Sequence, residues 1–379
     1  MQITRLADLA NTRACPRLVV KVGSSLLVGS EGVRRAWLDG LVRELAAARV
    51  RGQELIVVSS GAIALGAARL KLDKGGRGNL ADAQAAAAVG QIALSGLWAE
   101  LLGAHGLAAA QLLLTLDDLE DRRRYLNATA TLTRLLDLGA VPVINENDSV
   151  ATQEIRFGDN DRLAARVAQA AGASAVLLLS DVDGLFDRNP ASAGAIRLAE
   201  VRGVTPEIHA MASGGSASGM GSGGMTSKLQ AAEIAERAGI ALAIASGLVD
   251  APLARACGDE IGTLFLPKAP RGRKDAARKA WLGGRLKLKG ALVVDAGAVA
   301  ALGKGGSLLA AGIVAVEGEF KRGDAVAVRG PGGIIAHGLA EYDVADCTLL
   351  LGRKNSEQAA LLGYAPRSAV VHRDQMVLL

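Results

Sequence analysis

The amino-acid sequence predicts an α/β protein: an open, mostly parallel sheet with helices on both faces, followed by a small β-barrel-like domain. The sheet is predicted because short apolar runs alternate with amphipathic stretches over the first two thirds of the 379 residues. Half of the residues are apolar but only 3% are aromatic, which suits a large core of Ala, Leu and Val. Beyond residue 266 the alternation stops, and short strand-like runs separated by Gly-rich turns predict the small β domain.

Short apolar runs are expected to form buried parallel strands, and the amphipathic stretches between them are expected to form helices. The strands are predicted at residues 18–22, 55–58, 141–144, 176–179 and 241–245. The helices are predicted at residues 37–50, 118–138 and 227–238, each with a Gly near its end that is typical of a helix C-cap. Strand-like runs of the C-terminal part lie at residues 292–295, 313–317, 325–329, 334–339 and 369–372.

The sequence divides the chain into four segments. Residues 1–17 form an N-terminal extension to which no role is assigned, and residues 18–266 form the α/β domain. Residues 267–284 are rich in Pro, Gly and basic side chains and are expected to be a linker. Residues 285–379 form the small β domain.

Composition limits where the chain works and what it binds. The formal net charge of +5 is compatible with an anionic ligand but too small to indicate nucleic acid by itself. Three scattered cysteines argue against a disulfide framework and for a reducing compartment. Residues 1–20 lack the apolar core of a signal peptide, and the apolar runs are broken well short of the ~20 residues of a membrane helix. We therefore expect a cytoplasmic protein without a membrane segment.

Polar or Gly-rich sequence follows every predicted strand of the first domain. Lys21 lies at the end of the first strand, Ser60 follows the second, and Ser180 and Asp181 follow the fourth. Ligands of open α/β sheets bind beyond the carboxyl ends of the strands, so these residues are binding-site candidates. A Gly-rich run precedes Lys228, and Gly backbones and helix N-termini are suited to phosphate. Taken singly, Lys21 could mark a strand end and the Gly-rich run could be a flexible loop.

A dense polar group follows the third strand. Its seven members are Asn145, Glu146, Asn147, Asp148, Asp159, Asn160 and Asp161. Asp159 or Asn160 could cap a helix beginning near Arg162, and contact with solvent could explain two or three others, Glu146 and Asn147 among them. So many carboxylates and amides beyond a buried strand are better explained by a ligand that carries hydrogen-bond donors, such as an ammonium group.

These blocks occur in the order that is typical of the amino-acid kinase family. The chain resembles this family, and within it the glutamate 5-kinases, from about residue 18 to residue 247. Residues 285–372 resemble a PUA domain. Carbamate, aspartate and acetylglutamate kinases share the lysine and the glycine loops, but not "INEND" together with "GDND". The matching blocks are "KVGSS", "SSGAIALG", "LEDRRRYLNA", "VPVINENDSVATQEI", "FGDNDRLAA", "GMGSGGMTSKLQAA" and "LGYAPRSAVVHRDQMV".

The resemblance implies transfer of the γ-phosphoryl group of ATP, with Mg²⁺, to the γ-carboxylate of L-glutamate. The product is glutamyl 5-phosphate, and the reaction is the first step of proline biosynthesis. Lys21 and Lys228 would act on the transferred phosphoryl group, with Asp161 between them as the third catalytic residue. The substrate would be bound by Ser60, Asn145, Asp148, Asp159 and Asn160. The ATP-binding residues would be Lys21, Ser180, Asp181, Ser222, Gly223, Gly224, Met225, Thr226, Ser227 and Lys228. The sequence does not identify protein ligands of Mg²⁺.

The resemblance also implies regulation and partners. Proline, the end product, is expected to inhibit in competition with glutamate, because it keeps the α-carboxylate and α-nitrogen and lacks the γ-carboxylate. Glu154 is the only acidic residue in the segment 149–158, and we expect it to help distinguish proline from glutamate. The labile acyl phosphate would pass to glutamate-5-semialdehyde dehydrogenase, and the chain is expected to form a homo-oligomer.

Two alternative functions are weighed against this one. Another acid kinase of the same family would prefer aspartate, carbamate or acetylglutamate. An RNA-binding protein is suggested by the PUA-like domain and the basic linker. It is disfavoured because the C-terminal region has few aromatic side chains for base stacking: Phe320, Tyr342 and Tyr364.

Overall fold

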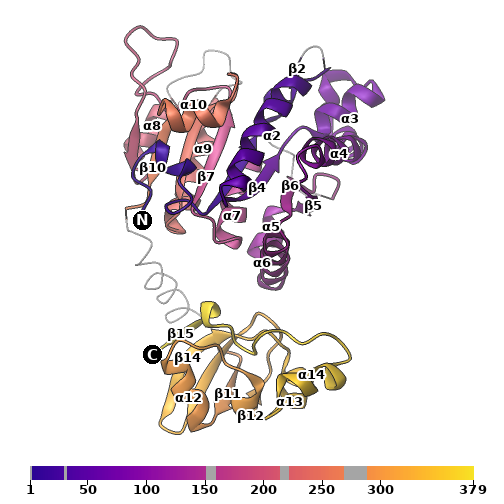
Figure 1. Cartoon of the computed structure of the whole chain (residues 1–379), viewed down its shortest axis with the longest axis vertical. Coiled ribbons are helices and arrows are strands. Elements are labelled where there is room, and N and C mark those ends of the chain that lie inside the picture. Colours follow the sequence, from indigo (N-terminus) through magenta and orange to yellow (C-terminus); the bar gives the residue numbers. More distant parts are fainter. Residues whose placement is uncertain (1, 30–31, 151–158, 214–221, 269–287) are drawn as a thin grey trace. The chain divides into compact units, whose positions relative to one another are not determined.

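The computed structural model describes residues 2–29, 32–150, 159–213, 222–268 and 288–379 (Figure 1). The chain divides into two compact units, residues 1–270 and 271–379. Each unit is described by itself. The first contains the large sheet and every described residue of the candidate site.

The large sheet of the first unit has the strand order β5-β6-β4-β1-β7-β9-β10-β8. Its strands run parallel except at β10, which is antiparallel to β9 and has β8 parallel to it. The carboxyl ends of the five central predicted strands therefore meet at one edge. The strands are β1 (Arg17–Val22), β4 (Glu54–Ser59), β5 (Ala109–Leu114), β6 (Val141–Glu146), β7 (Ala175–Ser180), β8 (Glu200–Arg202), β9 (Ala241–Ser246) and β10 (Thr263–Leu266). In a separate two-stranded sheet, β2 (Val28–Gly29) pairs antiparallel with β3 (Gly32–Val33).

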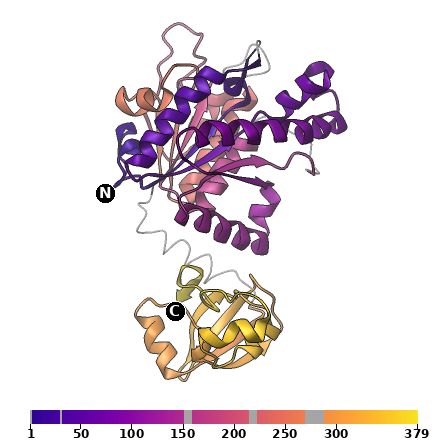
Figure 2. The ribbon, with the colours of Figure 1, turned by 45° about the vertical axis from the view of Figure 1, so that its right-hand side comes forward.

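Helices cover both faces of this sheet, as the sequence predicts. One face carries α2 and α4, which Figure 2 shows side by side, and the other carries α6, α7 and α9. Alternate residues of each strand enter the two cores: Val20 of β1 packs with α2, and Val19 packs with α7. The helices are α1 (Ser24–Leu27), α2 (Arg35–Val50), α3 (Ala62–Leu70), α4 (Leu80–Gly103), α5 (Leu116–Glu120), α6 (Arg122–Asp137), α7 (Asp159–Ala170), α8 (Pro206–Ser213), α9 (Ser222–Arg237) and α10 (Pro252–Gly258), with 3₁₀ turns η1 (Leu6–Ala10) and η2 (Asp73–Gly76).

All five strands predicted for the first domain are present, each within one or two residues of its predicted limits. The helix predicted at 118–138 is wrong as a single element. It is divided between α5 and α6, because Asp121 has an extended backbone and its side chain caps α6 by accepting from the backbone N–H of Arg124. The helix α9 begins at Ser222 and not at Ser227, so the Gly-rich run forms its first turn. Burial of Ser227, Lys228 and Leu229 offsets the low helix propensity of the glycines.

The segment before β1 is part of the first unit. Leu6 and Leu9 are buried in the core on the α2 face. The side-chain amide of Gln53 donates to the carbonyl oxygens of Leu9 and Cys15, both at 2.7 Å. The extension to which the sequence gives no role therefore contributes to the core of the α/β unit.

Two helices that the sequence did not predict, α3 and α4, pack closely against each other. A Cβ atom added at Gly66 would lie 1.8 Å from the carbonyl oxygen of Ala86, and one added at Gly90 would lie 1.8 Å from that of Ala62. Only glycine permits this backbone approach. The close packing brings the residue after Gly90 to the carboxyl edge of the sheet.

Among the described residues, α4 is the one helix long and apolar enough to cross a membrane by length and composition. The sequence analysis expected Gly or charge to break the apolar runs well short of this length, but Gly90 and Gly96 lie inside the helix and do not end it. Leu94, Trp98 and Leu102 of α4 are buried in the core of the first unit. This burial is typical of a core helix in a globular domain.

The second unit has a five-stranded sheet of order β12-β11-β13-β14-β15, in which β11 and β13 are parallel and the other pairs are antiparallel. Four predicted strands are confirmed. The fifth is wrong, because Val371 of the predicted run makes only an isolated bridge to Leu308, and the last strand lies at β15. The elements are β11 (Gly290–Val294), β12 (Ile313–Gly318), β13 (Ala325–Gly330), β14 (Gly333–Leu339), β15 (Met376–Leu378), α12 (Ala296–Gly303), α13 (Val344–Leu349) and α14 (Asn355–Leu362).

Candidate active site

Lys21 is directed to one face of the sheet by the alternation of β1. Val20 and Val22 pack into the core on the α2 face, so the side chain between them points to the face of α7 and α9. There it meets Asp161, in the first turn of α7, and Lys228, in α9. Three elements far apart in the sequence thus bring one carboxylate and two amines together.

The Lys21–Asp161–Lys228 group is held by short contacts. Lys21 Nζ lies 2.6 Å from Asp161 Oδ1, and Lys228 Nζ lies 3.1 Å from Asp161 Oδ2. Lys21 forms an ion pair with Asp161, and Lys228 donates a hydrogen bond to Asp161 and a longer one, 3.4 Å, to the carbonyl oxygen of Gly224. All three side chains are more than nine-tenths buried. The carboxylate therefore bridges the two amines, as the sequence analysis expects.

Burial and charge act in opposite directions on this group. Burial lowers the pKa of Lys21, and the nearby charge of Lys228 lowers it further, while Asp161 opposes both effects. Burial raises the pKa of Asp161, but the charges of Lys21 and Lys228 outweigh it and hold that pKa below the usual range. Two amines surround one buried carboxylate in this group. Such a site favours an anion.

A chain of amides lies at the same edge of the sheet. Asn160 Nδ2 donates to Ser60 Oγ at 2.8 Å and to Asn145 Oδ1 at 3.0 Å. Asn145 Nδ2 in turn donates to Gln91 Oε1 of α4 at 2.9 Å. Gln91 Nε2 is 3.4 Å from Ser95 Oγ, one turn further along α4. Three of the predicted substrate residues therefore form one hydrogen-bonded network.

Asn145 reaches α4 because the alternation of β6 directs it there. Ile144 packs into the core on the α7 face, so the next residue points to the opposite face. Asn160 is not the helix cap that the sequence analysis considers, because α7 already begins at Asp159 and the amide is used in the network. Asn160 and Asp161 are consecutive in a helix and point about 100° apart, so one joins the amides and the other joins the lysines.

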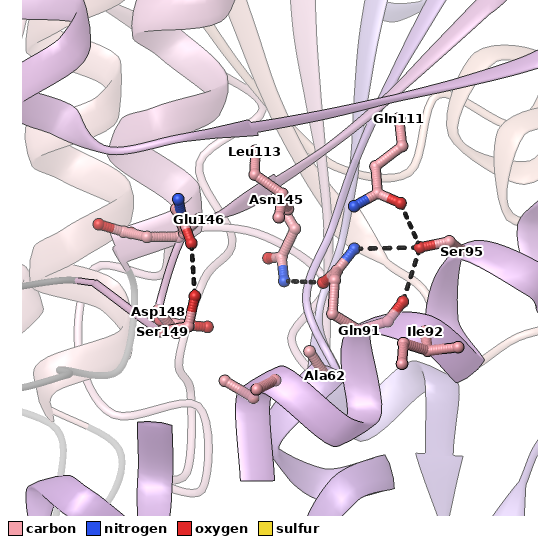
Figure 3. Close-up of a pocket in the computed structure, with 13 residues that line it drawn as sticks. Ala62, Gln91, Ile92, Ser95, Gln111, Leu113, Asn145, Glu146, Asp148 and Ser149 are labelled. Atoms are coloured by element: carbon pink, nitrogen blue, oxygen red, sulfur yellow. Dashed lines mark hydrogen bonds between the residues drawn. The ribbon is translucent and has the colours of Figure 1, made fainter. Parts of the chain in front are cut away.

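A cavity of about 280 Å³ opens beside this network (Figure 3). Gln91, Asn145 and Asp148 are among the residues that line it. Asp148 is partly exposed, and its charge acts on the half-buried Arg77, whose pKa is lowered by burial and raised by this carboxylate. An arginine beside a carboxylate could receive the opposite end of a zwitterionic ligand.

The predicted ATP-binding residues lie on β7 and α9. Ser180 ends β7 and its hydroxyl donates to Asp181 Oδ1 at 2.9 Å. Asp181 is close enough for its charge to raise the pKa of Lys21 against the effect of burial, which places it beside the lysine group. Gly224, Met225, Thr226 and Ser227 follow in the first two turns of α9.

Some predicted residues lie outside what the structure describes. These are Glu154 and the side chains of Asp159 and Ser222, with Gly223 at the edge of the described part. Within the described residues, no three His, Cys, Asp or Glu side chains gather as metal ligands. Mg²⁺ in kinases is usually bound through one or two carboxylates together with the oxygens of the nucleotide, which requires no preformed cluster of protein ligands.

The sequence analysis missed Gln91, Ser95 and Arg77. Gln91 and Ser95 lie on one face of α4 at helical spacing, but α4 is so rich in Ala that its amphipathic signal is weak. Arg77 belongs to a turn between α3 and α4. The only available signal for Gln91 and Ser95 was a polar side chain within an apolar run, which indicates burial or contact but not a particular partner.

Comparison with known families agrees with this geometry. The model of the Amino acid kinase family matches residues 16–246, which include every candidate site residue. The chain belongs to the amino acid kinase family. The model of the PUA domain matches residues 290–359, within the second unit.

Curated relatives span the whole chain. A glutamate 5-kinase of Novosphingobium aromaticivorans is 70% identical over 381 residues, covering 100% of both chains. That of Sphingopyxis alaskensis is 62% identical and covers 97% of this chain and 98% of its own. That of Zymomonas mobilis is 55% identical and covers 96% and 92%. The resemblance to the glutamate 5-kinases and to PUA domains that the sequence blocks indicated is thereby confirmed, and the protein is a kinase of this family.

Proposed function

We propose that this protein transfers the γ-phosphoryl group of ATP to the γ-carboxylate of L-glutamate, forming L-glutamyl 5-phosphate in the first step of proline biosynthesis. Three relatives with 55–70% identity over nearly the whole chain carry the name glutamate 5-kinase, which supports this substrate. The observation that carries the proposal is the buried group of two amines around one carboxylate at the carboxyl edge of the sheet.

The chemistry explains why this group is sufficient without a general base. A glutamate side chain ionises at about pH 4.3, so the attacking oxygen is already deprotonated at neutral pH. The barrier comes from bringing a carboxylate to a polyanionic phosphate and from the charge that develops in the transition state. Lys21 and Lys228 stabilise that charge, and their burial strengthens the effect. Asp161 holds both amines in place.

The amino-acid end of glutamate binds at the amide side of the same edge. Its α-ammonium is a donor with three hydrogens, and it requires acceptors. Asp148 supplies a carboxylate, and Asn145, Asn160 and Ser60 supply the hydrogen-bonded wall. Asp159 completes the predicted set on the basis of the resemblance alone. The cavity of about 280 Å³ beside these residues has room for a small amino acid.

ATP binds across β7 and the first turns of α9. Ser180 and Asp181 are suited to the ribose or base, and residues 222–228 are suited to the phosphates, because a helix N-terminus favours anions. Mg²⁺ bound to the nucleotide would neutralise phosphate charge. Lys21 and Lys228 then bind the transferred group from the opposite side.

Proline inhibition, assembly and hand-off complete the proposal. Proline would occupy the sites of the α-ammonium and α-carboxylate without offering a nucleophile, and Glu154 would help to discriminate it from glutamate. The acyl phosphate is labile, so its transfer to a glutamate-5-semialdehyde dehydrogenase would protect it. We further propose that the chain acts in the cytoplasm as a homo-oligomer.

The direct test is the release of ADP with Mg-ATP in the presence of hydroxylamine, measured for glutamate, aspartate, acetylglutamate and carbamate. We expect ADP and a γ-hydroxamate in equal amounts with glutamate. Use of aspartate or acetylglutamate at least as efficiently as glutamate would assign the chain to another acid kinase of the family. Lys21→Met serves as the matched control, because it should remove both products together.

RNA binding is not favoured as a second function. Residues 288–379, the described part of the second unit, contain nine Lys or Arg and nine Asp or Glu, so they carry no net positive charge. Proteins that bind nucleic acid through the phosphate backbone usually present a basic surface.

A further inference from the structure

We propose that Gln91 is a positioning residue for substrate binding: it fixes the amide of Asn145, and through it the amide of Asn160, so that Asn160 Oδ1 faces the α-ammonium of the substrate. This inference rests on the proposed function. Gln91 lies on α4, which contributes none of the predicted site residues, and it acts without touching the reacting atoms.

Ser95 sets the direction of the whole network. Its hydroxyl oxygen lies 2.6 Å from the carbonyl oxygen of Gln91 and 2.6 Å from Gln111 Oε1, as Figure 3 shows. A hydroxyl has one hydrogen, which it gives to one of these two oxygens. In either case no hydrogen is left for the side chain of Gln91. Ser95 can only accept from that amide, so Gln91 Nε2 must point toward Ser95.

The orientation of each side-chain amide then determines the orientation of the next one. With Nε2 toward Ser95, Gln91 presents Oε1 to Asn145, which must donate through Nδ2. Asn145 consequently presents Oδ1 to Asn160, which must also donate through Nδ2. Each amide has one donor and one acceptor end, so a single fixed hydroxyl at α4 selects one of the two orientations of the entire chain.

The result is a buried acceptor without a partner. Asn160 Oδ1 has less than 1 Å² of exposed surface and accepts no hydrogen bond, while the amide nitrogen of the same group makes two. An acceptor in this state is unfavourable until a donor arrives. In the reverse orientation the network would present an amide N–H group, which would repel an ammonium. The observed direction therefore selects a ligand that donates at this point.

The packing of α3 against α4 supports this role. Gly90 precedes Gln91 and lies so close to the backbone of α3 that no side chain fits there. The backbone at Gln91 is therefore fixed relative to β6, because moving it away would separate α3 from α4. A single amide direction needs such a fixed origin.

The experiment compares glutamate with glutarate, the dicarboxylate of the same length that lacks the α-nitrogen. For the full chain and its variants, KM is measured for glutamate and ATP, and Ki is measured for glutarate as a competitor of glutamate. In Gln91→Leu we expect the glutamate KM to rise about tenfold, with glutarate Ki and ATP KM changed less than about twofold. Gln91→Glu keeps an oxygen that accepts from Asn145 and should stay within about threefold of the wild type.

Two further variants keep the test decisive. Ser95→Ala removes the hydroxyl that fixes the direction, and should raise the glutamate KM about threefold without changing glutarate Ki. Glu100→Ala changes an exposed side chain of α4 that does not line the cavity, and should have no effect on either constant. If Gln91→Leu does not fold, the Ser95→Ala and Gln91→Glu results decide.

The outcomes separate this inference from the proposed function. If Gln91→Leu or Ser95→Ala raises the glutamate KM and the glutarate Ki by the same factor, the effect is a general structural one and the inference is overturned. An unchanged glutamate KM in both variants would overturn it as well. If the wild-type protein does not phosphorylate glutamate at all, the proposed function itself fails.

Discussion

The two faces of the sheet carry opposite kinds of chemistry at the same edge. On the face of α7 and α9, Lys21, Asp161 and Lys228 form a buried ionic group. On the face of α4, Asn145, Asn160 and Gln91 form a network of neutral amides. Ionic groups in a dry site act most strongly on charge that changes during reaction, whereas neutral amides with fixed donors and acceptors mainly recognise what is already bound. From this comparison we propose that reaction and recognition are assigned to different faces.

Two consecutive residues connect α7 to both the ionic group and the amide network. Asn160 and Asp161 both lie in the first turn of α7, yet the first joins the amide network and the second joins the lysines. The acidic residue also benefits from its place at the helix N-terminus, where negative charge is favourable. Members of the dense polar group in the sequence therefore belong to both the amide network and the ionic group, which meet at one turn of helix.

The largest expected effect lies on the ionic face. Lys21→Met or Lys228→Met should lower kcat about 100- to 1,000-fold, because each removes a charge that acts on the transition state. The glutamate KM should change little. Steady-state kinetics with both substrates varied will measure this split. A lysine variant with normal kcat and a raised glutamate KM would contradict this division, because it would show that the lysine acts in substrate binding and not on the transition state.

A smaller effect is expected on the face of the amides. Asp148→Ala and Asn160→Ala should each raise the glutamate KM about tenfold or more while kcat stays closer to that of the wild type, because both are proposed to hold the amino-acid end. Asp137→Ala, an exposed carboxylate at the end of α6, is the control. An unchanged glutamate KM in a folded Asp148→Ala protein would remove Asp148 from the substrate site.

Proline inhibition tests the residues that are proposed to bind the amino-acid end of glutamate. We expect inhibition to be competitive with glutamate and not with ATP, because proline shares only the amino-acid end of the substrate. Glu154→Ala should keep much of the kinase activity and weaken proline inhibition several-fold, on the order of a lost charged hydrogen bond. An inhibition series at fixed glutamate compares the two proteins. Equal proline sensitivity would exclude Glu154, and inhibition that glutamate cannot relieve would exclude a shared site.

The smallest effect is expected from removing the second unit. A chain that ends at Leu282 should remain folded and keep kinase activity within about a few-fold of the full chain, because the candidate residues precede it and the first unit has its own core. Circular dichroism and the ADP assay will report folding and activity. A well-folded shortened protein without activity would mean that the site depends on the PUA domain.

The sequence predicted the sheet from local patterns, whereas it placed Asp161 between Lys21 and Lys228 only through the resemblance to the family. Buried parallel strands appear as apolar runs, and Lys21 and Lys228 lie in motifs that belong to the family. The amide network was harder to predict. Asn145 and Asn160 were visible as polar residues at a strand end, but their partner Gln91 lies in an Ala-rich helix with little periodicity. Its contact depends on the glycine-mediated packing of α3 and α4, which is a tertiary effect.

The central claim is that the γ-carboxylate of glutamate attacks the γ-phosphoryl group at this edge of the sheet. It is tested most directly with glutamate labelled by ¹⁸O in the γ-carboxylate, with Mg-ATP and hydroxylamine. The acyl C–O bond breaks during trapping, so we predict phosphate that carries one ¹⁸O atom, together with a γ-hydroxamate and an equal amount of ADP. Phosphate without the label would show attack by water, and a hydroxamate at the α-carboxyl group would show the wrong nucleophile; either result would contradict the account.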